Sequence, residues 1–247
     1  MVRRDGSRKL NIMGGAAAAV APDLDEIFGS DLFLWYKRSS GITTDTGGVS
    51  QWDDATGNGW DISQSESTLR PELQAADLNG EDTILFDWPG GDFLGTLALG
   101  ASFVAKPFML GWVVKNQEVS DTGEWLGPEV NRGIKWVDPN WIWTGNGNDK
   151  TIGAPGTTDW HTLVFYFNSF TDGAGYMDGV KTDMSDLNYG ATLSNITLAA
   201  RDSGISPIDC TMAEFFLCDS ASNFTEDDVT SVLNKWNQVF GFSHEVS

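Results

Sequence analysis

Residues that commonly build catalytic sites are scarce in this 247-residue chain, which has only two histidines and two cysteines. His161 precedes a predicted strand and His244 lies near the C-terminus, and no Gly-x-Ser-x-Gly motif accompanies either of them. A nucleophile triad is therefore not indicated. No apolar run approaches the ~18–20 residues that a membrane-spanning helix requires. We expect a soluble chain in which His161 is a structural residue.

The two cysteines, Cys210 and Cys218, stand at the two ends of one predicted strand. Eight residues of extended chain separate their Cα atoms by about 26 Å. A disulfide requires Cα atoms within roughly 7 Å of each other. Neither cysteine belongs to a metal-binding motif, so we expect both to be buried thiols.

Positive charge is also in short supply, because 15 Lys and Arg residues stand against 35 Asp and Glu residues, for a net charge of −20. Residues 1–22 hold Arg3, Arg4, Arg8 and Lys9 and carry +3, which leaves −23 on the rest. An acidic body repels phosphate backbones, so nucleic acid is not an expected partner. The basic N-terminal arm is predicted to dock on an acidic surface, including a second copy of this protein. A solvated tail is the alternative.

After a helical turn predicted over Asp23–Phe28 and ended by Gly29, the pattern is β for almost two hundred residues. Asp178-Gly179 predicts a two-residue type I′ hairpin turn. Many short strands without alternating helices are typical of an antiparallel sandwich or barrel. The predicted strand segments are Leu32–Tyr36, Thr83–Phe86, Phe108–Lys115, Ile134–Val137, Trp141–Thr144, Leu163–Phe167, Gly175–Met177, Ile196–Ala199 and Met212–Leu217.

One amphipathic helix is predicted to close the chain. Thr225 is suited to cap it, with Asp228 three residues later, and Gly241 is suited to end it. Its apolar face contains Val229, Val232, Leu233, Trp236, Val239 and Phe240. We expect this helix to cover the sandwich. The chain then divides into the arm, residues 1–22, and one β-sandwich domain, residues 23–247.

The motifs of the first half follow one another in a familiar order: Leu32–Trp35, Val49–Gly59, Arg70–Pro71, Leu78–Gly80 and Ile84–Asp87. Later matching segments are Asp159–Phe165, Tyr176–Gly179 and Ala213–Phe216 with the helix over 225–240. Over about residues 31–242 the sequence resembles laminin G-like domains of the concanavalin A-like lectin/glucanase superfamily. The resemblance implies an all-β, two-sheet antiparallel jelly roll. It departs at Lys37-Arg38, where family members often have Asp, which puts a ligand contact there in doubt.

Glucanases of that superfamily resemble one another in a Glu-x-Asp-x-Glu strand motif, whose alternate carboxylates flank the sugar. This chain has no such motif. Glu124 and Glu129 form the nearest pair, but Gly127-Pro128 between them is unsuited to a strand interior. We therefore expect that the chain is not an enzyme.

The chain has 11 tryptophans, whose rings could stack on sugars or fill the core. Trp141 and Trp143 alternate along one predicted strand and so share a face. The predicted carbohydrate-binding residues are Trp136, Trp141, Trp143, Asn146, Asn148 and Asp149. Burial of the three rings in the sandwich core is the alternative.

Asp54 and Asn58 lie in a segment that partly imitates a calcium-binding loop. Thr56 and Ser65 depart from the ligands such a loop requires. The alternative is a plain turn, in which glycines give backbone freedom and Asp and Asn accept local amide hydrogen bonds. We therefore expect no cofactor, with Ca²⁺ as the one candidate.

Three functions remain, because this fold occurs in secreted enzymes, adhesins and virion proteins. The first is a structural protein of a larger assembly, such as a virion decoration, fibre or adhesion protein on a virion surface, which docks through its arm. The second is a secreted, lectin-like carbohydrate-binding module. The third is an enzyme resembling glycoside hydrolases. The arm of opposite charge and the scarcity of catalytic motifs favour the first.

Overall fold

A computed structural model describes residues 20–87, 91–98, 107–116, 122–129, 132–137, 140–145, 148–153, 159–169, 171–185, 195–199 and 209–247. The arm residues Arg3, Arg4, Arg8 and Lys9 lie outside the described residues. Within the described part, no helix is long and apolar enough to cross a membrane.

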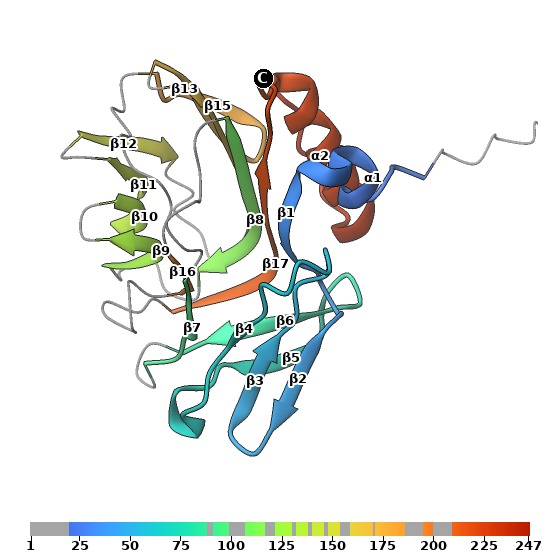
Figure 1. The fold of residues 1–247 in the computed structure, drawn as a ribbon, viewed down its shortest axis with the longest axis vertical. Coiled ribbons are helices and arrows are strands. Elements are labelled where there is room, and N and C mark those ends of the chain that lie inside the picture. The colour runs from blue at the N-terminus through green and yellow to red at the C-terminus, as the bar shows by residue number, and fades with distance from the viewer. Residues whose placement is uncertain are drawn as a thin grey trace, which may run out of the picture.

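Most of the chain forms two antiparallel sheets (Figure 1). The larger sheet has eight strands in the order β15-β14-β13-β8-β17-β6-β5, with β1 also paired to β17. Its strands are β1 (Leu32–Tyr36), β5 (Glu72–Leu78), β6 (Glu81–Phe86), β8 (Phe108–Asn116), β13 (Trp160–Ser169), β14 (Asp172–Met177), β15 (Val180–Asp183) and β17 (Cys210–Asp219).

The second sheet has six strands in the order β12-β11-β10-β9-β16-β7. Its strands are β7 (Leu94–Ala98), β9 (Thr122–Glu129), β10 (Arg132–Val137), β11 (Asn140–Gly145), β12 (Asn148–Gly153) and β16 (Asn195–Leu198). A small third sheet joins β2 (Ile42–Asp45), β3 (Gly48–Trp52) and β4 (Ile62–Ser63). These sheets confirm the predicted all-β, antiparallel sandwich.

The helices lie on one side of the larger sheet, and the six-stranded sheet lies on the other (Figure 1). Alternation along β8 shows how one strand serves both layers: Leu110 and Trp112 face the layer between the sheets, whereas Met109 and Val113 face the helices. Gly111 lies where an added Cβ would come 3.0 Å from the ring of Trp236, so the absent side chain lets the C-terminal helix pack closely.

The helices are α1 (Leu24–Phe28), followed by the 3₁₀ turn η1 (Gly29–Asp31), and α2 (Glu226–Phe240). A second 3₁₀ turn, η2 (Ser67–Leu69), precedes β5. Thr225 and Asp228 form a capping box at the start of α2, and Gly241 ends it with φ of 77°. These are the caps that the sequence predicts. The apolar face of α2, including fully buried Trp236, packs on the larger sheet.

Two further predictions are confirmed by the structure. Cys210 and Cys218 are buried free thiols in β17. Asp178 and Gly179, between β14 and β15, have φ values of 51° and 85°, as a type I′ turn requires.

Candidate functional site

A polar cleft of about 310 Å³ lies where α1 and η1 meet the turn over residues 54–58, which we call the Asp54 turn. A volume near 300 Å³ is at the small end of ligand sites. The cleft brings together a carboxylate, two hydroxyls, an amide and an apolar surface. The lining residues are Asp25, Gly29, Ser30, Leu32, Ala55, Thr56 and Asn58.

The Asp54 turn is fixed by the carboxylate of Asp54, which is buried. Its Oδ1 accepts hydrogen bonds from the backbone N–H groups of Trp35 and Thr56, each at 3.0 Å. The Thr56 hydroxyl donates to the same carboxylate at 2.7–2.8 Å. Gly57 and Gly59, with φ near 80°, allow the chain to reverse around it. The turn is thus tied to β1 and holds its outer side chains in place.

Asn58 is the exposed polar side chain at the tip of the turn. Its Nδ2 donates to the carbonyl oxygen of Phe33 at 2.9 Å, and its backbone N–H donates to the Thr56 hydroxyl at 3.2 Å. Fixing the amide nitrogen in this way also fixes the carbonyl oxygen of the side chain. Asn58 can therefore offer an oriented hydrogen-bond acceptor to a ligand.

These contacts also bear on the calcium hypothesis for Asp54 and Asn58. Donors from Trp35, Thr56 and Trp60 contact the two carboxylate oxygens of Asp54, so a cation there would have to displace them. Asn58 directs its amide nitrogen, not its oxygen, toward Phe33 of the same wall. Among the described residues, no group of three or more His, Cys, Asp or Glu side chains is arranged to hold a metal ion.

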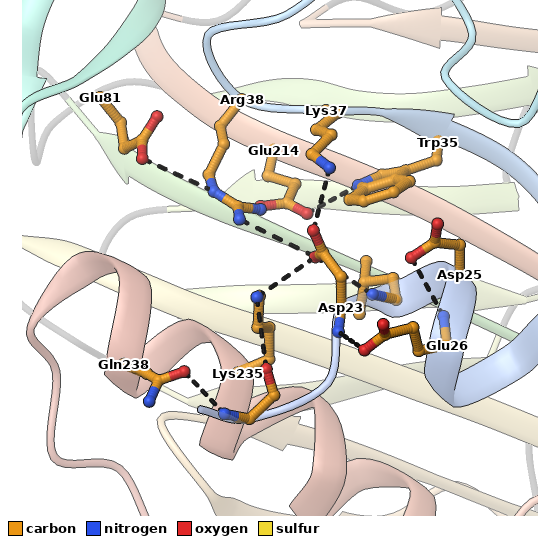
Figure 2. Close-up of polar contacts among 12 residues, drawn as sticks. Asp23, Asp25, Glu26, Trp35, Lys37, Arg38, Glu81, Glu214, Lys235 and Gln238 are labelled. Carbon is orange, nitrogen blue, oxygen red and sulfur yellow. Dashed lines mark hydrogen bonds and ion pairs between the residues drawn. The ribbon is translucent and has the colours of Figure 1, made fainter. Parts of the chain in front are cut away.

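The opposite wall of the cleft, α1, is capped by Asp23, whose side chain joins a network of charges with the residues that follow β1, with β17 and with α2 (Figure 2). Lys37 Nζ lies 2.9 Å from Asp23 Oδ2, and Arg38 and Lys235 lie 3.8 and 3.6 Å from Asp23 Oδ1. Burial acts to raise the pKa of Asp23, but the hydrogen bond from Lys37 and the nearby charges bring it below its ordinary value. The carboxylate is therefore held in its charged form.

Glu214, which is fully buried, lies between Arg38 and Trp35 in this network (Figure 2). Its Oε2 accepts from Arg38 Nη1 at 3.0 Å, and its Oε1 accepts from Trp35 Nε1 at 2.6 Å. A β-bulge between Met212 and Glu214 sets Glu214 opposite Val113, whose side chain faces the helix layer. Burial raises the pKa of Glu214, and Arg38 opposes that rise. The network fixes α1, and with it Asp25, on the sheet.

The predicted carbohydrate-binding residues Trp136, Trp141, Trp143, Asn148 and Asp149 belong to strands of the six-stranded sheet, and none of them lines this cleft. Trp143, on β11, is fully buried and packs 4.8 Å from Phe167 and 5.0 Å from Phe165, measured between ring centroids. Its ring belongs to the core, which was the alternative to a ligand platform. Asp149, on β12, is exposed.

The remaining members of that prediction cannot be placed in full. The strands place Trp136 opposite Trp141 in the register of β10 and β11, and Asn148 opposite Gly145 in that of β11 and β12. The side chains of Trp136, Trp141 and Asn148, and all of Asn146, lie outside the described residues.

Both histidines converge on one carboxylate at the other end of the helix layer. Asp178 Oδ2 lies 2.6 Å from His161 Nδ1, and Asp178 Oδ1 lies 3.4 Å from His244 Nδ1. The same Oδ1 accepts the backbone N–H of Thr162 at 2.8 Å. His161 is buried, in keeping with the structural role predicted for it. The pair anchors the C-terminal segment beside the β14–β15 hairpin.

Two other clefts lie along α2. One, of about 280 Å³, is lined by Thr230, Leu233, Asn234, His244, Glu245 and Val246. The other, of about 440 Å³, is lined by Val20, Ala21, Pro22, Ser231, Asn234 and Gln238. Both are bounded by terminal segments. The cleft at the Asp54 turn is lined instead by α1, η1, the start of β1 and the Asp54 turn, with neither terminal segment among its lining residues.

No known protein family and no curated protein sequence matches this chain. Solved structures share its fold. Trypanosoma rangeli sialidase with the inhibitor DANA is 14% identical over 90% of this chain and 36% of the sialidase, with a TM-score of 0.63. The binding domain of Paraclostridial Mosquitocidal Protein 1 is 13% identical over 81% of this chain and 52% of its own, with a TM-score of 0.57.

A third similar structure is the ligand-binding domain of botulinum neurotoxin serotype D in complex with N-acetylneuraminic acid. It is 13% identical over 83% of this chain and 50% of the toxin domain, with a TM-score of 0.56. This chain therefore spans between about a third and a half of the structures it resembles. At such identities the likeness shows a shared β-sandwich fold.

The similarity to sialidases corrects the expectation that this chain is not an enzyme. That expectation rested on the missing Glu-x-Asp-x-Glu motif, which belongs to a different group of glycosidases. Because sialidases, as well as toxin binding domains, contain this sandwich, the missing motif does not exclude catalysis.

Proposed function

We propose that this domain is a lectin-like, glycan-binding module and that its glycan site is the cleft at the Asp54 turn. The observation that carries the proposal is that the polar side chains of Asp25, Ser30 and Asn58 line one cleft beside the apolar Leu32 and Ala55, with Asn58 held by its hydrogen bond to Phe33. Sugars present hydroxyls beside C–H faces and need such mixed surfaces. Groups held before binding lose little conformational entropy when the ligand arrives.

The fold supports the same proposal. A toxin domain with this sandwich has been solved with N-acetylneuraminic acid, and the sialidases act on sialic acid-bearing sugars by name. The role in a virion or other assembly, with docking through residues 1–22, stays a prediction from the sequence, as does a virion-surface or secreted location.

A glycan array followed by calorimetric titration of the best ligand tests the proposal. Asn58→Ala should weaken binding by up to about tenfold, since one lost hydrogen bond to a bound hydroxyl costs about 0.5–1.5 kcal/mol. Because Asn58 is exposed, loss of its hydrogen bond to Phe33 should lower the free energy of unfolding by about 1 kcal/mol or less.

Asp149→Ala and Trp141→Ala serve as matched variants at the site predicted from the sequence. If these two abolish binding while Asn58→Ala leaves it intact, the glycan binds over β11 and β12 instead. If the array shows no glycan above background, the lectin-like function itself is refuted.

A further inference from the structure

The charges around the cleft at the Asp54 turn indicate which class of glycan it accepts. Its one charged lining residue is acidic: Asp25 is exposed, and its Oδ1 accepts the backbone N–H of Glu26 at 3.0 Å (Figure 2). No lysine or arginine is among the lining residues. A bound anion would therefore meet a carboxylate and no lining counter-ion.

The two basic side chains that follow β1, Lys37 and Arg38, are already engaged elsewhere. Lys37 Nζ contacts Asp23 at 2.9 Å and lies 4.3 Å from the centre of the Trp35 ring. Arg38 is buried against Glu214. Turning Arg38 toward the cleft would leave the fully buried Glu214 without its cation, which is costly. Turning Lys37 away would break its ion pair with Asp23.

The turn adds further negative charge behind the lining. The Asp54 carboxylate holds the turn, and Asp61 accepts the backbone N–H of Asp54 at 2.9 Å. The whole chain carries −20, so the net charge of the protein also disfavours an anionic ligand.

From these charges we infer that the cleft takes an uncharged sugar residue, with Asp25 accepting hydrogen bonds from its hydroxyls, and that it discriminates against glycans ending in an acidic sugar. This inference rests on the proposed function, but it differs from the acidic ligand of the similar toxin domain. A negative charge on the glycan about 4 Å from the Asp25 carboxylate, in a water-like dielectric, weakens binding about fivefold. The effect is larger where solvent is excluded.

The test compares N-acetyllactosamine with its sialylated form by titration at low and at physiological salt. We expect the neutral glycan to bind at least fivefold more tightly at low salt. The ratio of the dissociation constants of the sialylated and neutral glycans should shrink as salt is added. Asp25→Asn keeps the shape of the side chain and should reduce the ratio severalfold.

Asp183→Asn is the matched control. Asp183 is exposed on β15, five strand positions from β1, or about 24 Å along the sheet. This change should leave the ratio unaltered. If the sialylated glycan binds more tightly than the neutral one, the inference is overturned. The proposed function still stands in that case, provided that Asn58→Ala weakens glycan binding. Binding of no glycan, neutral or sialylated, on the array overturns both.

Discussion

Replacing Arg38 tests how the charge network holds α1 on the sheet. Arg38→Met would leave the Glu214 carboxylate, which is fully buried, with the single hydrogen bond from Trp35. Removing one partner of a buried ion pair costs about 3–5 kcal/mol. We expect a loss of that size in the free energy of unfolding, measured by urea denaturation at pH 7. This is a large part of the stability of an ordinary domain.

The pH dependence of the same variant gives a second readout. Burial already raises the pKa of Glu214, and loss of the Arg38 charge removes an effect that opposes the rise. When the pKa of a carboxyl group is raised in the folded state, the folded protein is more stable with that group protonated. The stability of the fold therefore falls as pH increases. The loss in free energy of unfolding caused by Arg38→Met should therefore be larger at pH 8 than at pH 5.

Two controls separate this reasoning from a simple loss of packing. Lys37→Met removes a partly exposed cation of the same network and should cost about 1 kcal/mol or less. Adding Glu214→Gln to Arg38→Met should recover much of the loss, since no buried charge then remains. The reasoning fails if Arg38→Met costs no more than Lys37→Met, or if the double variant is no more stable than Arg38→Met alone.

Two further predictions concern pH. Burial raises the pKa of Asp92 to about 6, so its contribution to stability is largest below the unfolded value near 3.8 and is lost as pH rises through 6. Asp92→Asn should therefore raise the melting temperature by several degrees at pH 8 and by much less at pH 4; an equal gain at both pH values would contradict this. Burial lowers the pKa of His244, so the anchoring of the C-terminal segment should weaken as pH falls below about 6.5. Amide exchange protection of residues 242–247 should drop from pH 7.5 to pH 5.5, and unchanged protection would show that His244 does not control this contact.

The sequence predicts the elements whose signals are local. The strand segment Leu32–Tyr36 coincides with β1, and the Thr225 cap and Gly241 stop bound α2 as expected. β2 and β5 were not predicted, because most of their residues are exposed and give no apolar alternation. Such strands form through pairing with neighbours, which local patterns do not report.

The charge network and the cleft depend on contacts between distant parts of the chain. Arg38 and Glu214 are 176 residues apart, so their pairing follows from the fold and not from spacing. One signal was present: Glu214 stands alone among apolar residues of a predicted strand, and a buried carboxylate requires a partner. Asp25 and Asn58 share a cleft only because α1 and the Asp54 turn both meet the start of β1.

The position of a bound glycan tests the central proposal most directly. The measurement is a crystal structure of the protein with the tightest ligand from the array. We predict a sugar residue in the cleft, within hydrogen-bond distance of Asn58 and Asp25 and against Leu32. A glycan bound only elsewhere, such as over β11 and β12 beside Asp149, would contradict the assignment of this cleft.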